Sequence, residues 1–201
     1  MQKPIILIGA GPLGLNAAHI VRQQGAFEIA GFVDAKKTAV GGIEILGDDS
    51  VLESLKNRGV SHAVVCIGDP RKRIAVAAQL KQKGFALPAL VHPYADLGIG
   101  AQIGEGSIIF HGSFVGAQTV IGPYCVIEAG AFVGHDCLLQ EGVLLSARAC
   151  LGNHVSVGSC STFRLGAGCA NKVRIGQGCV VGEFRSVLAD LADNAVAEPA
   201  S

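Results

Sequence analysis

Two adjacent residues stand out as able to do chemistry in this chain of 201 residues, His135 and Asp136 in the stretch GAFVGHDCLL. A neutral imidazole accepts a proton from a hydroxyl or an amine, because histidine titrates at about pH 6.5. A neighbouring carboxylate can orient the ring and stabilise the imidazolium that forms. The pair therefore suggests a general base, provided that a turn of the backbone lets the two side chains meet.

Glycines near the start of the chain form a second candidate site. Gly9, Gly11 and Gly14 fit the pattern G-x-G-x-x-G, with a strand-like run before them and a helix-like run after them. Asp34 follows at the end of a second strand-like run. Such glycines let the backbone approach a phosphate at a helix N-terminus, and the carboxylate can accept a hydrogen bond from a ribose hydroxyl. The pattern predicts a nucleotide site without separating NAD from a nucleotide-sugar; a plain tight turn is the alternative.

A third group of candidate residues is expected at the same edge of a parallel sheet as the glycines. Gly68 and Asp69 end a third strand-like run, and ligands of open parallel sheets bind at the carboxyl ends of the strands. Arg71, Lys72 and Arg73 follow directly. This basic trio either contacts phosphate or forms the solvated first turn of a helix.

These candidate residues need elements to position them, and the first half of the chain alternates strands with helices. Such alternation predicts a parallel sheet covered by helices, a short version of a nucleotide-binding fold. The expected strands are PIILI, FEIAGFVDA, HAVVCIGD and FALPALVHP, and the expected helices are LNAAHIVRQQ, DDSVLESLKNR and PRKRIAVAAQLKQK.

The second half repeats every six residues, in sixteen hexads from Leu97 to Ala192. The first position is Leu, Ile or Val in fourteen hexads, the second is Gly in nine, and the fifth is small or Val in fourteen. Residues that alternate in a short strand face the same side, so the first and fifth positions point to a core. Three hexads make a triangular coil of about eighteen residues, and such coils stack as a parallel β-helix of about five turns. A β-sandwich would not keep one six-residue frame for so long.

The repeat places His135 and Asp136 at the third and fourth hexad positions, near an outward-facing corner. Two other histidines compete for the role of base. His111 has the same hexad position on a different face, and His154 lies beside Asn153, one coil after His135. No H-x-H or H-x4-H pattern occurs, so no metal site is expected.

Composition excludes several classes of protein. Sixteen basic and sixteen acidic residues leave no net charge, which argues against nucleic acid as a partner. No signal peptide and no apolar run long enough for a membrane span are present. Seven cysteines without a C-x-x-C pattern indicate reduced thiols and a cytoplasmic protein.

The chain resembles the bacterial sugar acetyltransferases, both sialic-acid O-acetyltransferases and UDP-4-amino-sugar N-acetyltransferases. The resemblance covers nearly the whole chain and rests on the Gly9–Gly14 loop, GFVDAKK, CIGDPRKR, LVHPYA, VGHDCLL and the terminal AEPAS. It implies a Rossmann-like domain over residues 1–92 that binds the nucleotide-sugar, a left-handed β-helix over residues 93–192 that carries acyl transfer, and a C-terminal tail over residues 193–201.

The resemblance also implies roles and partners. His135 is the general base and Asp136 its acidic partner, Gly9, Gly11, Gly14, Asp34, Gly68 and Asp69 line the acceptor site, and acetyl-CoA is a co-substrate with no permanently bound cofactor. Family members are homotrimers in which acetyl-CoA lies along the β-helix between neighbouring subunits. Outward apolar residues such as Phe110 and Phe132 would then meet a partner surface.

Donor contacts are implied at Leu144, Asn153 and Gly182. The chain departs from the family here, because Leu144 stands where a second histidine is frequent. Glu183, Phe184 and Arg185 replace small residues that leave room for CoA. These departures predict weak affinity for acetyl-CoA.

The expected function is transfer of an acetyl group from acetyl-CoA to an amino group or hydroxyl of a nucleotide-linked sugar, such as a UDP-sugar. The alternative is a trimeric nucleotide-binding scaffold or sensor without transferase activity, which the bulky turn at Phe184 would favour. An NAD oxidoreductase is a third possibility, but no second catalytic domain is apparent.

Overall fold

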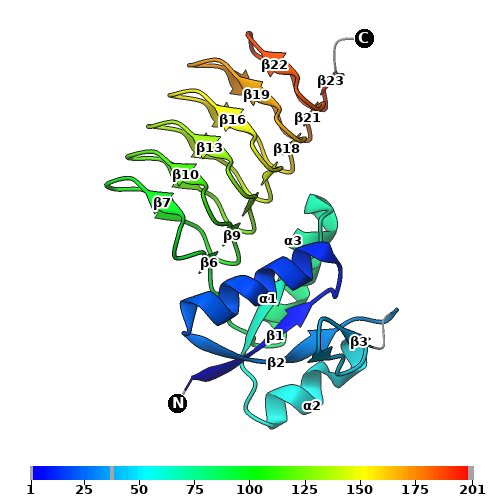
Figure 1. The fold of residues 1–201 in the computed structure, drawn as a ribbon. Helices are drawn as coiled ribbons and strands as arrows, with labels where there is room; N and C mark the ends of the chain where they lie inside the picture. The colour runs from blue at the N-terminus through cyan, green and yellow to red at the C-terminus, as the bar shows by residue number, and fades with distance from the viewer. Residues whose placement is uncertain (1, 37–38, 199–201) are drawn as a thin grey trace. The chain divides into compact units, whose positions relative to one another are not determined.

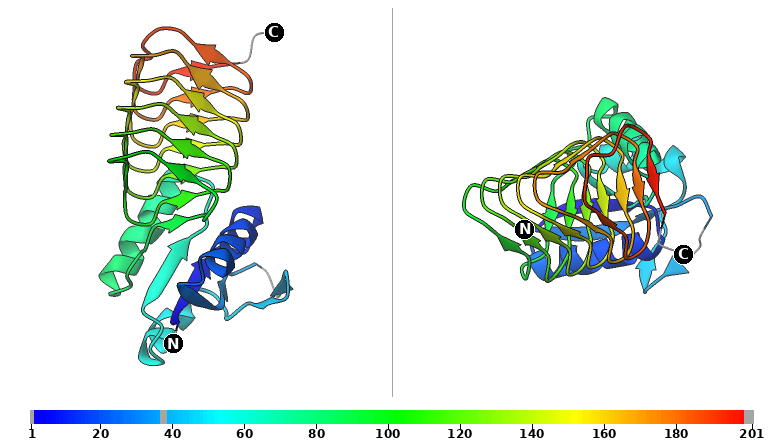
Figure 2. Two further views of the ribbon diagram at one scale, coloured as in Figure 1. Left: turned by 60° about the vertical axis from the view of Figure 1, so that its left-hand side comes forward. Right: turned by 90° about the horizontal axis from the view of Figure 1, so that it is seen from above.

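The computed structural model describes residues 2–36 and 39–198. The chain forms two compact units, Met1–Pro93 and Tyr94–Ser201. Figure 1 and Figure 2 show the first unit as a sheet with helices and the second as a stack of short parallel strands. Among the helices of the described residues, none has the length and apolar character needed to cross a membrane.

The first unit is built on a parallel sheet with the strand order β2-β1-β5. Its strands are β1 (Lys3–Ile8), β2 (Phe27–Val33) and β5 (His62–Val65). The central strand β1 is buried from Ile5 to Ile8. A run of apolar residues without alternation is what a strand covered on both faces requires. Figure 2 shows α1 and α3 on opposite sides of this sheet.

Helices follow the strands as expected from the sequence. Helix α1 (Pro12–Gln24) begins after Gly11 and ends at Gly25, which adopts the left-handed conformation with φ 66°. A short 3-10 turn, η1 (Asp49–Val51), leads into α2 (Leu52–Asn57). Helix α3 (Pro70–Gln82) begins with Pro70, whose missing N–H costs nothing in a first turn.

Two parts of the first unit differ from the expectation. The expected strand FALPALVHP is reduced to β6 (Leu90–Val91) and a single bridge between His62 and Ala86. The chain contains two prolines in this stretch, which cannot donate to a ladder of hydrogen bonds. A small antiparallel hairpin, β3 (Ala39–Val40) with β4 (Ile43–Glu44), was not anticipated because each strand has only two residues.

The basic trio at the start of α3 divides between surface and core. Arg71 and Lys72 are exposed, whereas Arg73 is completely buried. The Arg73 guanidinium donates hydrogen bonds to the carbonyl oxygens of Ile67 at 2.7 Å and Gly68 at 2.9 Å. The suggestion that Arg73 contacts a phosphate is therefore wrong, because its donors already hold the loop between β5 and α3.

The second unit is a parallel β-solenoid of about six turns, a left-handed β-helix. Two-residue strands recur every six residues from β7 to β22, in the frame expected from the sequence. One sheet contains β7 (Asp96–Leu97), β10 (Phe114–Val115), β13 (Phe132–Val133), β16 (Cys150–Leu151), β19 (Gly168–Cys169) and β22 (Ser186–Val187). The next contains β8 (Gln102–Ile103), β11 (Val120–Ile121), β14 (Leu138–Leu139), β17 (Ser156–Val157) and β20 (Arg174–Ile175). The third contains β9 (Ile108–Ile109), β12 (Val126–Ile127), β15 (Leu144–Leu145), β18 (Thr162–Phe163), β21 (Val180–Val181) and β23 (Val196–Ala197).

The interior of the coils has the composition that the repeat predicts. First-position residues from Ile109 to Val187 are all buried, and so are fifth-position residues from Ser107 to Cys179. Leu97, at the open first coil, keeps 39% of its surface exposed because no earlier coil covers it. The expectation that Phe110 points outward is wrong, since Phe110 is only 5% exposed, whereas Phe132 is 41% exposed.

The corners between sheets share one backbone conformation. The fourth hexad position is left-handed from Gly100 to Phe184, as a glycine or as a residue such as Gln118, Asp136 or His154, with φ between 56° and 57° at these three. The left-handed region reverses the chain within one or two residues, which a triangular coil needs three times per turn. Coils at a corner are then joined by backbone hydrogen bonds between residues about one coil apart.

The last coil is two residues shorter than the others. Val180 pairs with Val196, and Ile175 forms a bridge with Leu191, so the offset is sixteen residues instead of eighteen. The six-residue frame therefore ends inside the last hexad, and β23 continues the third sheet into the stretch expected to be a tail. Pro199, Ala200 and Ser201 of the terminal AEPAS lie outside the described residues.

Replacing Arg73 with methionine should destabilise the first unit by about 2 kcal/mol or more, because the carbonyl groups of Ile67 and Gly68 would lose a buried donor. The matched control is Arg71→Met, which alters an exposed residue two positions earlier in the same helix. Chemical denaturation of both variants measures the difference. Equal stabilities would contradict the structural role of Arg73.

Candidate active site

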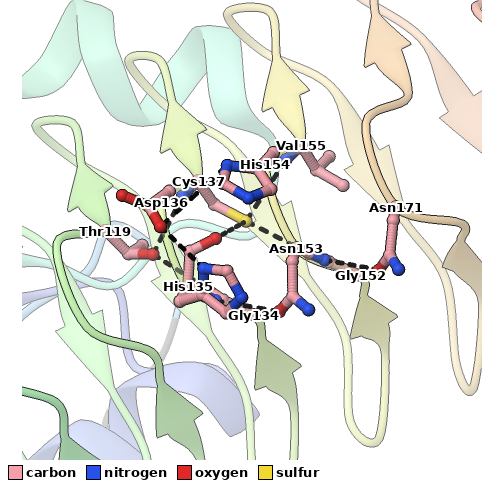
Figure 3. Close-up of polar contacts among 10 residues, drawn as sticks. All are labelled: Thr119, Gly134, His135, Asp136, Cys137, Gly152, Asn153, His154, Val155 and Asn171. Atoms are coloured by element: carbon pink, nitrogen blue, oxygen red, sulfur yellow. Dashed lines mark hydrogen bonds and ion pairs between the residues drawn. The ribbon is translucent and has the colours of Figure 1, made fainter.

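His135 and Asp136 occupy the corner between β13 and β14 (Figure 3). Asp136 is the left-handed residue of this corner, with φ 56°. The reversal at Asp136 brings two side chains that are neighbours in sequence into contact, with His135 Nδ1 at 2.6 Å from Asp136 Oδ2. The corner thus supplies the turn that the pair needs.

Inward side chains of the preceding coil brace this corner. Thr119 Oγ1 donates to the carbonyl oxygen of Gly134 at 2.7 Å and accepts from the N–H of Cys137 at 3.0 Å. These two contacts lie on either side of His135 and Asp136. Gly134 has no room for a side chain, because a Cβ atom would lie 2.6 Å from the carbonyl oxygen of Gly152. The conformation of the pair is therefore set by residues that do not themselves reach the surface.

An asparagine ladder holds the third hexad position from the next coils. Asn153 Oδ1 accepts from the N–H of His135 at 3.1 Å, and Asn171 Oδ1 accepts from the N–H of Asn153 at 2.8 Å. The stack His135, Asn153, Asn171 repeats at intervals of eighteen residues. Asn153 therefore supports the backbone of His135 through its side-chain oxygen.

His154 stacks under Asp136 at the fourth hexad position. Its N–H donates to the carbonyl oxygen of His135 at 2.9 Å, and its Nδ1 lies 3.9 Å from Asp136 Oδ2. The rings of His135 and His154 meet edge to face, with centroids 4.8 Å apart and an interplanar angle of 85°. Two imidazoles thus share the surroundings of one carboxylate, as Figure 3 shows.

The geometry suits proton transfer at the surface of the coil. The side chains of His135 and Asp136 are 47% and 46% exposed, so a substrate can reach them. An ionised carboxylate only accepts hydrogen bonds, so His135 Nδ1 carries the hydrogen in this contact. In the neutral ring Nε2 then bears the lone pair, and this nitrogen is the candidate base.

Cysteine chemistry does not compete with the histidine here. Cys137, the cysteine next to the pair, points inward and is 2% exposed. Burial raises the pKa of the Cys137 thiol, and burial also raises the pKa of Cys169 to about 12. Because the thiolate is the nucleophilic form, these thiols are poor nucleophiles near neutral pH.

The other candidate histidine, His111, occupies the corner between β9 and β10. That corner is one side of the triangle away from the corner of His135 and Asp136. The structure therefore brings His154 next to the pair and leaves His111 elsewhere.

The glycine loop of the first unit has the geometry that close approach requires. Gly9 has φ 100°, and a Cβ atom at Gly14 would collide with the carbonyl oxygen of Gly9. Gly11 has open space around its Cα, with no atom within 4 Å of a Cβ placed there. Gly9 and Gly14 are thus required by the turn itself, whereas Gly11 leaves one face of the loop free.

Asp34 and Asp69 both bind backbone N–H groups near this edge. Asp34 Oδ2 accepts from the N–H of Ala10 at 2.9 Å, so its carboxylate joins the end of β2 to the glycine loop. Asp69 caps α3 by accepting from the N–H of Lys72 at 2.9 Å. Gly68, just before it, is exposed with open space around its Cα. The expected acceptor residues therefore lie at one edge of the sheet. The two aspartates at this edge also form hydrogen bonds with backbone N–H groups.

The three expected donor residues lie on different parts of the coil. Asn153 lies at the corner of His135, Leu144 lies half-buried in β15 of the third sheet, and Gly182 is buried in the corner that follows β21. Phe184, two residues after Gly182, is 74% exposed. Only Asn153 is brought next to His135 within one chain.

Patterns of neighbouring residues missed the closeness of His154 to Asp136. His135, Asp136 and His154 each offer a ligand atom, and these three atoms lie within 4.8 Å of one another. A search for H-x-H or H-x4-H cannot detect the group, because the relevant spacing is one coil. The signal was present as the eighteen-residue offset between Asp136 and His154.

Each of the two units matches the model of a known protein family. The model described as PglD N-terminal domain matches residues 4–80, and the model described as bacterial transferase hexapeptide (six repeats) matches residues 100–135. A parallel sheet followed by hexapeptide coils with an exposed histidine is thus the architecture of a hexapeptide-repeat transferase.

Similar solved structures identify a family within the hexapeptide-repeat transferases. A histidine-to-asparagine mutant of perosamine N-acetyltransferase from Caulobacter crescentus, in complex with CoA and GDP-perosamine, is 32% identical, with 98% of this chain and 93% of that chain covered and a TM-score of 0.95. The acetyltransferase domain of PglB from Neisseria gonorrhoeae, in complex with acetyl coenzyme A, is 28% identical, with coverage of 99% and 97% and a TM-score of 0.94. WeeI from Acinetobacter baumannii, at 17% identity and a TM-score of 0.69, shares the fold. The chain belongs to the family of sugar N-acetyltransferases with a PglD-type N-terminal domain and a left-handed β-helix.

Replacing Asn153 with alanine should lower the free energy of unfolding by about 1 kcal/mol, because the N–H of His135 loses its acceptor. Asn171→Ala is the matched control, since it removes the equivalent acceptor one coil further from His135. Denaturation should give similar losses for both variants, and only Asn153→Ala should disturb catalysis. Unchanged stability of Asn153→Ala with a raised KM for the donor would instead favour a direct donor contact.

Proposed function

We propose that this protein transfers an acetyl group from acetyl-CoA to the amino group of a nucleotide-linked sugar, with His135 as the general base. The observation that carries this proposal is the contact between His135 Nδ1 and Asp136 Oδ2 at an exposed corner of the β-helix. Membership of the family supplies the reaction class, and the pair supplies a base whose side chain is nearly half exposed to solvent. Acetyl-CoA is a co-substrate, in keeping with the related acetyltransferases.

The chemistry balances without a covalent acyl-enzyme. The neutral amine attacks the thioester carbonyl carbon, a C–N bond forms, and Nε2 of His135 takes the proton that the nitrogen loses. Collapse of the tetrahedral intermediate breaks the C–S bond, and the imidazolium returns the proton to the CoA thiolate. Asp136 remains ionised and stabilises the imidazolium between these two steps. Holding both substrates in one site supplies much of the rate enhancement.

The first unit is the proposed site for the nucleotide of the acceptor. The open face at Gly11 allows a phosphate to approach the N-terminus of α1, where backbone N–H groups and the helix dipole favour negative charge. Gly68 offers a second unobstructed position at the same edge. Gly9, Gly14, Asp34 and Asp69 shape this edge. The nucleotide is a UDP or GDP derivative in this proposal, because the acceptor in the related complex is GDP-perosamine.

A homotrimer is the proposed assembly. Within one chain Leu144, Asn153 and Gly182 lie on different parts of the coil, so they cannot line one donor groove unless a second chain contributes. The stacked rings of Phe114 and Phe132, 5.0 Å apart on the outer face of one sheet, are apolar surface that a neighbouring subunit would cover. The seven free cysteines support a reducing, cytoplasmic location.

Replacing His135 with alanine should lower kcat by about a hundredfold or more, the usual effect of losing a general base, and leave the melting temperature unchanged. Asp136→Asn should cost less, because this residue orients the ring and does not accept the substrate's proton. Steady-state kinetics and thermal unfolding are the measurements.

His111→Ala is the control for that experiment, since His111 has the same hexad position at another corner. Full activity in a folded His135→Ala protein would reject the base, and a joint fall in activity and melting temperature would make the residue structural.

Replacing Gly11 with valine should abolish stabilisation by nucleotide, because the side chain would fill the open face of the loop. UDP or GDP derivatives should raise the melting temperature of the wild-type protein by linkage to the folded state. Gly11→Ala should show an intermediate shift, and the ligand-free melting temperatures should stay within a few degrees. A thermal shift with NAD and none with UDP or GDP derivatives would contradict a nucleotide-sugar site and indicate that the first unit binds a dinucleotide.

Light scattering should give a mass of three times the 20.5 kDa chain. Phe132→Asp should reduce this mass, because a charge would be buried in the proposed interface. The control is Leu188→Asp, which changes an exposed apolar residue in the last coil. A fully active wild-type monomer would contradict a donor site shared between subunits.

A further inference from the structure

The corner that carries the proposed base also presents three metal-binding side chains from two successive coils. His135, Asp136 and His154 are the only such group of three found among residues 2–36 and 39–198. We infer that this corner is a binding site for Zn²⁺ and similar transition-metal ions, and that an ion bound there switches acetyl transfer off. The regulatory half of this inference rests on the proposed role of His135 as the base.

The ligand atoms converge on one carboxylate oxygen. Asp136 Oδ2 lies 2.6 Å from His135 Nδ1 and 3.9 Å from His154 Nδ1. A tetrahedral zinc ion bonds nitrogen and oxygen at about 2.0–2.2 Å, so its ligands lie roughly 3.3 Å from one another. The two observed distances lie on either side of that value. Small rotations of side chains that are nearly half exposed would bring all three atoms into range.

The backbone behind these ligands is already held in place. Thr119 braces the corner of His135 and Asp136 through the carbonyl of Gly134 and the N–H of Cys137. Cys137 braces the next corner in the same way, because its Sγ lies 3.2 Å from the carbonyl oxygen of Gly152 and accepts from the N–H of Val155 at 3.4 Å. Two rigid corners therefore present their ligands at fixed spacing, and little backbone order is lost on binding.

Ligand number and exposure point to a reversible site. Two imidazoles and one carboxylate are a donor set that zinc accepts with a fourth position left for water. Imidazole nitrogen favours zinc, copper and nickel over magnesium and calcium, which prefer sites made wholly of oxygen. The site is open to solvent, so an ion can enter and leave without unfolding.

Inhibition follows from the tautomer of His135. An ion on Nδ1 takes the lone pair of that nitrogen, so the ring hydrogen must lie on Nε2. The Nδ1 hydrogen leaves to solvent and Nε2 gains one from solvent, so the neutral ring changes tautomer without a net change in protons. Nε2 then has no lone pair for the amine's proton. The ion also takes the carboxylate that would stabilise the imidazolium.

Metal binding can be measured on the untagged chain without substrates. The protein is stripped with EDTA, dialysed and titrated with Co²⁺, whose visible absorption bands report coordination by nitrogen and oxygen. Added Zn²⁺ should displace Co²⁺ with one ion per chain. His154→Ala should bind Zn²⁺ at least about tenfold more weakly, because loss of a direct ligand costs no less than loss of an outer-shell partner. His111→Ala should bind like the wild-type protein.

The activity arm compares each protein with its own metal-free rate. Zn²⁺ should inhibit the wild-type and His111→Ala enzymes over the concentration range in which it displaces Co²⁺, and EDTA should restore the rate. His154→Ala should need at least about tenfold more Zn²⁺ for the same fractional loss. Thermal unfolding of the metal-free variants establishes that each is folded.

The outcomes separate the inference from the proposed function. Absence of Co²⁺ bands in the wild-type protein, or equal Zn²⁺ affinity in the wild-type and His154→Ala proteins, overturns the metal site even if the enzyme is active. Tight Zn²⁺ binding to an enzyme that stays fully active overturns the switch. Metal binding through His154 in a protein without acetyl transfer upholds the site and rejects the proposed function.

Discussion

The left-handed residue at the fourth hexad position, repeated from Gly100 to Phe184, is the constraint on which the second unit depends. A triangular coil must change direction three times in eighteen residues, and the left-handed conformation achieves this within a single residue. Several of these positions are glycine, but Asp136, His154, Lys172 and Phe184 take the same conformation. Hydrogen bonds between stacked coils offset the free energy that the left-handed conformation costs at the non-glycine residues. The left-handed Asp136 is thus a property of the fold that the site uses, and no special strain at the site has to be invoked.

At the corner of His135 and Asp136, the residues that hold the backbone are different from the residues that are exposed to solvent. The fifth hexad position points inward, where Thr119 and Cys137 hold the backbone of the following coil. The third and fourth positions point outward, where His135 and Asp136 are exposed. A side chain in solvent normally samples many positions, but here its backbone is fixed on both sides and its ring is held by a carboxylate. Substitutions in the outward pair should therefore alter activity with little effect on the core.

Charged side chains near the glycine loop of the first unit also make structural hydrogen bonds. Asp34 and Asp69 lie at the edge that we propose for the nucleotide, and each accepts a hydrogen bond from a nearby backbone N–H. Arg73, which charge alone would place at a phosphate, is buried against the carbonyls of Ile67 and Gly68. Charge near a glycine loop is therefore weak evidence for ligand contact until burial and partners are known. Gly11, which has no side chain and no close neighbour, marks the free face of the loop more clearly than the charged residues do.

The sequence by itself determined the parallel sheet, the six-residue frame of the β-helix, its inward positions and the outward placement of His135 and Asp136. These follow from local periods and from glycine spacing, because alternation within a strand and reversal at a corner are local properties of the chain. The outward assignment of Phe110, the phosphate role of Arg73 and the extent of the last coil came out differently, since packing against residues far along the chain decides them. The eighteen-residue coil already indicated that Asn153 and His154 lie one coil after His135 and Asp136. Only the tertiary structure showed which atoms meet, with the N–H of His135 donating to Asn153 Oδ1 and with His154 Nδ1 at 3.9 Å from Asp136 Oδ2. These contacts depend on side-chain conformation and on the exact register between coils, and the spacing of residues in the sequence contains neither.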